Sequence, residues 1–153
     1  MPGKLIMLSP DEGFNIAESD LRLALQRAVP DREAHIRHAR LNDSHDCGMH
    51  VSEIFDRVAC HVHFSGDEVY EIICGYGVIY SGPVRVEGDQ AEVRPVDSME
   101  VFPGDVFKIP QGVAHQLVRK GEEPLIIIFA CHDNHMGPDR RILPDICPEG
   151  RED

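Results

Sequence analysis

Short apolar runs separated by turn residues fill the chain from His50 to Cys131. Within several runs apolar and polar residues alternate, as they do in a strand with one buried face. Gly, Pro and Asp interrupt the runs at close intervals, and one such turn is expected at Ser81-Gly-Pro. Many short strands at this spacing predict an all-β antiparallel sandwich or barrel. The predicted strands are Val51–Phe55, Val58–Phe64, Val69–Cys74, Val78–Tyr80, Val84–Val86, Ala91–Pro95, Val106–Ile109, His115–Val118 and Leu125–Cys131.

The first fifty residues follow a different pattern. One short strand is expected at Lys4–Leu8. Good helix formers predict a helix at Asp20–Val29, with Asp20 as its N-cap and Pro30 ending it.

The length of 153 residues suits one compact domain and leaves no room for two. Within it we expect an N-terminal extension, residues 1–50, that packs on a barrel, residues 51–135. Residues 136–153, which end in polar sequence, are expected to form a tail.

The formal net charge of −12 argues against nucleic acid and anionic membranes as partners. No stretch is long and apolar enough to span a bilayer, and the longest candidate, Leu125–Cys131, suits a buried strand. The N-terminus lacks the apolar core of a signal peptide, so we expect a cytoplasmic protein.

The cysteines indicate free thiols rather than a disulfide framework. Their number, five, is odd, and no Cys-x-x-Cys occurs. Because Cys60, Cys74 and Cys131 lie in strand-like runs, we expect them to be buried and inert.

A His-x-His pair followed by a glutamate is the first candidate for chemistry. In a strand, residues two apart share a face, so His61 and His63 point the same way. After a tight turn, alternation places Glu68, Tyr70 and Ile72 together on one face. Two imidazoles and a carboxylate can then converge on a cation, which would offset the unfavourable burial of these groups. His-x-His alone fits ordinary core or surface histidines equally well, and Glu68 favours the metal.

A second stretch favours the same site. Gly104 opens a predicted strand, Pro110 ends it, and Gly112 permits a tight turn before His115. His115 then starts a strand that runs back toward the first pair of histidines.

These two stretches resemble the two motifs of the cupin family. The first matches as His61-x-His63-x4-Glu68-x6-Gly75 and the second as Gly104-x5-Pro110-x-Gly112-x2-His115. The resemblance implies a jelly-roll β-barrel, a homodimer formed by sheet extension, and one divalent transition metal ion held inside. The ligands that it implies are His61, His63, Glu68 and His115. Such ligands suit Fe, Mn, Ni, Co, Cu or Zn without choosing among them.

Two residues are candidates for contact with a substrate. Tyr70 shares the inward face with Glu68 and can donate a hydrogen bond or relay a proton. Arg119, four residues after His115, stands where the family often has Asn, and its guanidinium suits an anionic ligand. The alternative is that the strand has ended and Arg119 begins a solvated turn. A second departure, Phe55 in place of a frequent Gly, is expected to change only a turn.

The resemblance leaves three functions open. The first is a metalloenzyme, with isomerase/lyase or dioxygenase chemistry on a small oxygenated metabolite such as a sugar, hydroxy acid or keto acid. The second is a cupin that binds or senses a sugar or similar ligand without catalysis. The third is a barrel that the metal only stabilises.

Two other polar clusters carry weaker signals. His45-Asp46-Cys47-x2-His50 has no established metal-ligand spacing, and a polar loop is the preferred interpretation. His132-Asp-Asn-His135 follows the last predicted strand and either lines the barrel mouth or forms a solvated loop.

Overall fold

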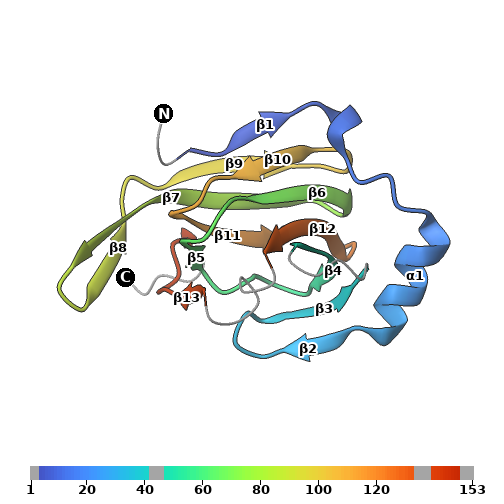
Figure 1. Cartoon of the computed structure of the whole chain (residues 1–153), viewed down its shortest axis with the longest axis horizontal. Coiled ribbons are helices and arrows are strands. Elements are labelled where there is room, and N and C mark those ends of the chain that lie inside the picture. The colour runs from blue at the N-terminus through green and yellow to red at the C-terminus, as the bar shows by residue number, and fades with distance from the viewer. Residues whose placement is uncertain (1–3, 42–46, 133–138, 149–153) are drawn as a thin grey trace.

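Strands make up most of the computed structural model, which describes residues 4–41, 47–132 and 139–148 (Figure 1). One α-helix, α1 (Glu18–Arg27), and one short 3₁₀ helix, η1 (Pro10–Glu12), lie near the N-terminus. The strands are β1 (Ile6–Leu8), β2 (Val29–Asp31), β3 (Ile36–Arg40), β4 (Cys47–Ile54), β5 (His61–His63), β6 (Glu68–Cys74), β7 (Gly77–Glu87), β8 (Gln90–Val93), β9 (Asp97–Val101), β10 (Val106–Ile109), β11 (Val113–Arg119), β12 (Leu125–His132) and β13 (Arg140–Ile142).

The strands form two curled antiparallel sheets that face each other. The larger sheet has the order β1-β10-β6-β12-β4-β3-β2. The smaller sheet has the order β13-β5-β11-β7-β8, with β9 also paired to β7. Many neighbours in these sheets are distant in sequence, such as β12 and β4 or β11 and β5, as in a jelly roll, and this confirms the predicted all-β barrel. The β7–β8 hairpin projects from one end of the barrel (Figure 1).

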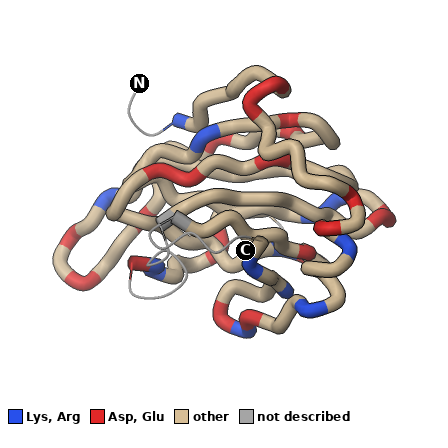
Figure 2. Tube along the Cα trace, turned by 45° about the vertical axis from the view of Figure 1, so that its right-hand side comes forward, with Lys and Arg blue, Asp and Glu red and all other residues tan. Residues whose placement is uncertain are grey.

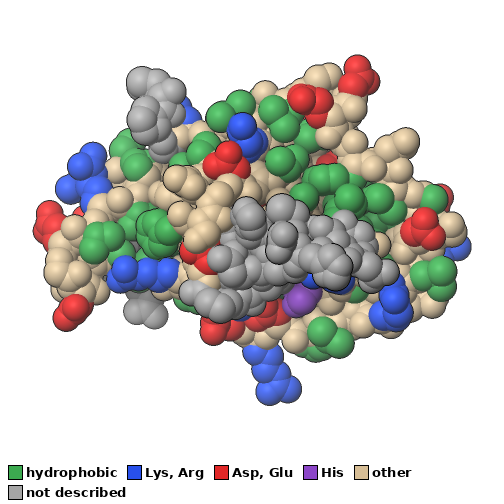
Figure 3. Space-filling model, in the orientation of Figure 1, with side chains coloured by type: hydrophobic (Ala, Val, Ile, Leu, Met, Phe, Trp, Pro, Cys, Tyr) green, Lys and Arg blue, Asp and Glu red, His purple; other side chains and the backbone are tan. Residues whose placement is uncertain are grey.

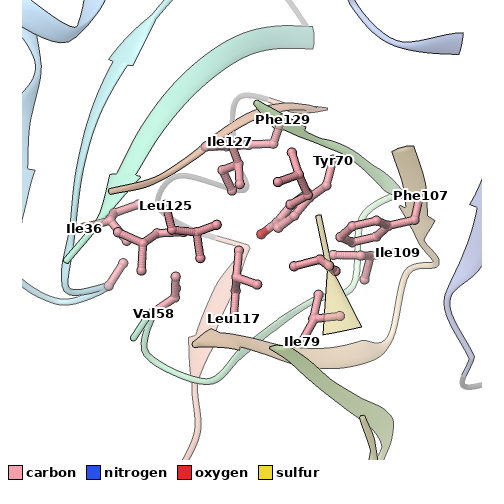
Figure 4. Close-up of a cluster of buried hydrophobic side chains, with 14 of the residues drawn as sticks. Ile36, Val58, Tyr70, Ile79, Phe107, Ile109, Leu117, Leu125, Ile127 and Phe129 are labelled. Atoms are coloured by element: carbon pink, nitrogen blue, oxygen red, sulfur yellow. The ribbon is translucent and has the colours of Figure 1, made fainter. Parts of the chain in front are cut away.

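A cluster of apolar side chains fills the space between the sheets. The alternation predicted for β6 is confirmed, because Tyr70 and Ile72 are buried in this cluster. Leu117 of β11 meets them from the smaller sheet (Figure 4). The labelled members in Figure 4 are Ile36, Val58, Tyr70, Ile79, Phe107, Ile109, Leu117, Leu125, Ile127 and Phe129.

Helix α1 covers the outer face of the larger sheet. Its Leu21 and Ala24 pack with Val51 of β4 and Ile128 of β12. The helix begins at Glu18, so the prediction of Asp20 as N-cap was wrong. The N-cap position is held by Ala17 without a side-chain hydrogen bond, and the acidic first turn stabilises the helix N-terminus instead. No helix in the described ranges has the length and apolar composition needed to cross a membrane.

Strand β7 runs without interruption through the turn predicted at Ser81-Gly-Pro, and that prediction was wrong. Ser81, Gly82 and Pro83 pair with His115, Ala114 and Val113 of β11. Glycine suits this strand interior because a Cβ on Gly82 would lie 2.1 Å from the carbonyl oxygen of Pro95.

Both ends of the described chain contribute strands to the sheets. Strand β1 pairs with β10, while β3 pairs with β4 and carries β2 at the sheet edge. Strand β13, which lies within the segment 136–153 expected to be a tail, pairs with β5. The sequence pattern missed β2, β3, β9 and β13, which have three to five residues each.

Four cysteines are free thiols: Cys60, Cys74, Cys131 and Cys147. Cys60, Cys131 and Cys147 are buried, and burial raises the pKa of the Cys60 thiol to about 12. Cys74 is only partly buried, so the expectation of a buried thiol was wrong there. Its side chain lies at the end of β6, with Sγ 3.9 Å from a carboxylate oxygen of Glu123.

Charged residues are dispersed over the surface. Lys and Arg are scattered among the Asp and Glu residues along the described chain (Figure 2). The face in Figure 3 likewise mixes small hydrophobic and charged areas.

Replacing Gly75 by Ala should lower the free energy of unfolding by about 2–5 kcal/mol. The loss has two causes, because the alanine would be held in a left-handed backbone conformation and its Cβ would overlap a neighbouring carbonyl group. Gly75 has φ +90°, and an added Cβ would lie 2.5 Å from the Pro124 carbonyl oxygen. Gly104→Ala is the matched control, because Gly104 has φ +96° with open space around it. The control should lose only about 1–2 kcal/mol. Equal losses for both variants in urea unfolding would contradict the steric argument.

Candidate metal centre

Three strands bring the four predicted ligands together. His61 and His63 lie in β5, Glu68 opens β6, and His115 lies in β11 directly opposite His61. One donor atom of each residue lies within 4.8 Å of those of the other three. All four side chains are buried. The sequence-predicted constellation is therefore assembled inside the barrel.

Backbone carbonyl groups orient two of the imidazoles. His61 Nδ1 lies 2.8 Å from the carbonyl oxygen of Ala59, and His115 Nδ1 lies 3.1 Å from that of Val113. A carbonyl oxygen only accepts, so each Nδ1 carries the hydrogen and donates. Nε2 of each ring is then left with a lone pair for a metal, the arrangement usual for histidine ligands.

The centre of the cluster contains polar atoms without hydrogen-bond partners. Glu68 Oε1 lies 3.1 Å from His63 Nε2 and 3.2 Å from His115 Nε2. Among the described residues, neither Glu68 Oε1 nor His115 Nε2 makes a hydrogen bond. A lone pair on Nε2 facing a carboxylate oxygen is unfavourable unless a cation lies between them. The residues present thus fit a divalent cation.

The electrostatics of the cluster favour the ligand forms of His61 and Glu68. Burial, together with the neighbouring His115 and His63, holds the pKa of His61 well below its ordinary value. Burial alone would raise the pKa of Glu68, but hydrogen bonds from His115 and His63, which form when the facing Nε2 carries a proton instead of a metal, hold the pKa well below the usual range. A neutral imidazole and a carboxylate are the forms that bind metals.

A network of hydrogen bonds fixes the turn between β5 and β6. The backbone N–H groups of Phe64 and Ser65 each donate to the Asp139 carboxylate at 3.1 Å. Asp139 Oδ2 also lies 4.0 Å from His63 Nδ1. No local sequence signal indicated this role for Asp139, because it lies more than seventy residues beyond this turn.

The turn before His115 is joined to the same region. Gly112 N donates to the His63 carbonyl oxygen at 2.7 Å, and Gln111 N donates to Asp67 Oδ1 at 2.9 Å. Gly112 has φ +78°, the conformation expected for a glycine in this turn.

A narrow cavity adjoins the ligands, with about 20 Å³ open to the centre of a water molecule. His61, His63 and Glu68 lie in its wall, together with Tyr70 and Arg140. The remaining lining residues are mainly apolar: Ala34, Ile36, Ser52, Ile54, Val58, Ile127 and Phe129.

Tyr70 lies where the alternation of β6 placed it. Its ring is nearly perpendicular to that of His115, with centroids 5.8 Å apart. Figure 4 shows its hydroxyl group pointing into the space between the sheets. Burial and the nearby Glu68 raise the pKa of Tyr70 well above its ordinary value, so the hydroxyl stays protonated.

Arg119 is not among the residues that line the cavity, so its predicted contact with a substrate gains no support from the structure. Its Nε donates to the carbonyl oxygen of Gly121 at 3.0 Å, and Nη1 donates to that of Phe55 at 3.3 Å. Nη2 donates to the carbonyl oxygen of Glu122. Arg119 ends β11 four residues beyond His115, roughly 13 Å along an extended strand. The guanidinium therefore closes a turn at the other end of the barrel.

The arginine in the cavity wall is Arg140, which sequence reasoning missed. Arg140 pairs with His63 across β13 and β5, so both side chains face the barrel interior. The only signal in the sequence was an arginine pair after a polar segment, and nothing local indicated a strand there.

The two weaker polar clusters fall largely on residues 42–46 and 133–138, which lie outside the described residues. His50 is described: it is buried and its ring stacks on Phe129 with centroids 5.1 Å apart.

Comparison with solved structures identifies the fold. No family model and no curated protein matches the sequence. Solved structures do match. One is a variant of the oxalate decarboxylase OxdC from Bacillus subtilis, which gives TM-score 0.56 and 18% identity over 78% of this chain and 31% of that one. CapF with a bound tropolone inhibitor gives TM-score 0.56 and 19% identity over 76% of this chain and 34% of that one. A conserved Klebsiella pneumoniae protein with a double-stranded β-helix domain gives TM-score 0.55 and 16% identity over 86% and 97%.

The fold and the buried cluster together define a jelly-roll barrel with a possible metal site of three histidines and one glutamate. The chain has the cupin fold, also called the double-stranded β-helix. It spans about a third of the length of the oxalate decarboxylase and of CapF.

Replacing His115 by Ala should remove most of the bound metal, because it removes one of the four ligands. Elemental analysis of protein saturated with Mn²⁺ or Zn²⁺ and then desalted measures this. His35→Asn is the matched control, since His35 is exposed and its φ of +63° is one that Asn tolerates. Wild-type metal content in the His115 variant would exclude His115 as a ligand.

Proposed function

We propose that the protein is a metal-dependent enzyme acting on a small oxygenated metabolite, by isomerase/lyase or dioxygenase chemistry. The observation that carries this proposal is the cavity beside the His61, His63, Glu68 and His115 cluster. A purely structural metal site is normally closed by its protein ligands, whereas a site that adjoins a cavity leaves room for an exogenous ligand.

The donor set defines what a metal would contribute. Three imidazoles and one carboxylate suit a divalent transition ion, which, when bound, polarises a substrate oxygen and orients the substrate. The carbonyl groups behind His61 and His115 hold the rings in place, and the apolar wall excludes water.

Tyr70 has the position and protonation state of a donor. Its raised pKa makes it a poor base at neutral pH, but its hydroxyl can donate to a substrate oxygen or return a proton to it. We propose this as its role in the reaction.

The similar structures support the general proposal that this protein is an enzyme. One is named as an oxalate decarboxylase, and CapF was solved with an inhibitor. Carbon–carbon bond cleavage in a small acid is accordingly one of the lyase reactions to be tested here.

Ligand binding without catalysis is the second candidate. The observation that favours it is the scarcity of proton acceptors, since Tyr70 and Arg140 are the titratable cavity residues outside the ligand set among those described. Neither is a base at neutral pH. A reaction that needs a general base must then take it from a ligand side chain or from water.

Elemental analysis of the metal-replete protein, combined with a substrate screen that monitors oxygen uptake, tests the proposal. The screen should include hydroxy acids, keto acids and sugars. Oxygen uptake with a substrate would indicate dioxygenase chemistry, and product without uptake would indicate isomerase or lyase chemistry. Saturable binding with no product would select the binding function, and absence of metal would overturn the metalloenzyme.

Tyr70→Phe should keep metal content at the wild-type level while turnover falls by about 10²-fold or more, the usual contribution of a positioned proton donor. The ring packing against Phe107 and Phe129 remains in this variant, so the fold is retained. Tyr76→Phe is the control, because the Tyr76 hydroxyl donates to Glu100 at the surface. Unchanged turnover in the Tyr70 variant would leave the ring as core packing only.

The expected homodimer and cytoplasmic location stay predictions. Light scattering at micromolar concentration tests the first, and a monomer alone would contradict it.

A further inference from the structure

Ser52 places a hydroxyl group in the cavity wall without a partner. It lies on β4 with its side chain on the inner face of the larger sheet, 1% exposed, and it lines the cavity beside the metal ligands. Its Oγ is buried and makes no hydrogen bond within the described chain. A buried hydroxyl in an apolar wall is unfavourable unless something bonds to it.

Of the two residues opposite Ser52 in the sheet, Ile127 of β12 is apolar, and His38 of β3 does not satisfy the hydroxyl. His38 is directly opposite Ser52 in the β3–β4 register. Its Nδ1 is likewise buried without a hydrogen bond among the described residues. The two groups therefore do not pair with each other, and Ser52 remains available to a ligand.

Arg140 faces the same cavity from the opposite sheet. Its side chain is 7% exposed and is held by Asp31, with Nη1 2.8 Å from Oδ2, and by Glu33, with Nη2 3.2 Å from Oε1. These contacts occupy the outer nitrogens of the guanidinium. The Nε–H group is buried and has no acceptor in the described part of the chain. The ion pairs thus fix the guanidinium while leaving one charged donor unused.

We infer that Ser52 and Arg140 form a subsite for the distal oxygen atoms of a small hydroxy- or keto-carboxylate. This inference rests on the proposed function, because the metal centre would take the other end of the same ligand. Ser52 Oγ and Arg140 Nε donate to the ligand from the two walls, and Tyr70 lines the same cavity. The three groups are donors suited to carboxylate, keto and hydroxyl oxygens.

Charge and size favour a carboxylate over a phosphate. A divalent cation bound with Glu68 leaves a charge of about +1 at the ligands. The buried Asp31 offsets the charge of Arg140, and Glu33, which is 61% exposed, adds a weaker, solvent-screened contribution. The single negative charge of a carboxylate neutralises the positive charge left at the ligands, whereas the two negative charges of a phosphate dianion exceed it. The cavity is also narrow and mostly apolar, and this suits a ligand of few atoms.

The test measures binding of lactate and pyruvate to Mn²⁺-loaded protein by calorimetry, with lactamide as the uncharged analogue of lactate. Ser52→Ala and Arg140→Lys are the variants, and the lysine of the second variant keeps a cation for Asp31 but lacks the Nε–H donor. Ser98→Ala and Arg141→Lys are the matched controls. Ser98 is exposed on β9, and Arg141 is exposed on the opposite face of β13. Metal content and the midpoint of thermal unfolding without ligand are recorded for each protein.

Lactate or pyruvate should bind the wild type at least tenfold more tightly than lactamide, and each cavity variant should weaken that binding by about tenfold or more. Both controls should bind as the wild type does. Metal content should not change in either cavity variant. Without ligand, Ser52→Ala should unfold at the same temperature as the wild type or higher, because the substitution removes an unpaired buried hydroxyl.

Several outcomes would overturn the subsite. These are wild-type affinity in both cavity variants, equal binding of lactamide and lactate, and no binding of either acid. Tighter binding of glycerol phosphate than of lactate would also overturn the carboxylate assignment. If the wild-type protein binds no metal, the proposed function is refuted, and this outcome is distinct from failure of the subsite. Acid binding to that metal-free protein, weakened by both variants, would still support the subsite.

Discussion

The close approach of the Glu68 carboxylate to the Nε2 atoms of His63 and His115 is the constraint on which the centre of this protein depends. Four polar side chains are buried together, and Glu68 Oε1 and His115 Nε2 have no hydrogen-bond partner among the described residues. Burying such groups is unfavourable by several kcal/mol unless they bond to something, on the order of the desolvation of unpaired polar groups. The arrangement is consequently best explained as a site preorganised for a divalent ion.

The surrounding hydrogen bonds follow from that constraint. Gly112 N bonds to the His63 carbonyl oxygen, so the turn before His115 is tied to the strand that carries the first histidines. Asp139 holds the turn before Glu68 from the far end of the described chain. Strand β13, which follows Asp139, then brings Arg140 opposite His63. The candidate metal centre and the cavity wall are therefore built by one continuous set of contacts.

The sequence predicts features that depend on residues close together in the chain, and it misses features that depend on pairing between distant strands. The ligand set was predicted because strand alternation fixes which residues share a face over a few positions, and the two motifs each span fewer than sixteen residues. Asp139, Arg140 and Ser52 were not predicted, because their roles depend on pairing between distant strands. The turn expected at Ser81-Gly-Pro failed for the same reason. Turn chemistry is a local preference, and pairing of seven consecutive β7 residues with β11 overrides it.

Strand β11 shows how the barrel separates its stability from its chemistry. His115 lies in the metal cluster, Leu117 is buried in the apolar core, and Arg119 closes a turn beyond the core. Alternate residues of one strand thus pass through three environments in roughly 13 Å. The core between the sheets contributes apolar burial, whereas the unpaired Ser52 hydroxyl and Arg140 Nε–H group contribute little or nothing to folding. Substitutions in that wall can therefore change which ligand is bound while the core continues to hold the metal ligands in register.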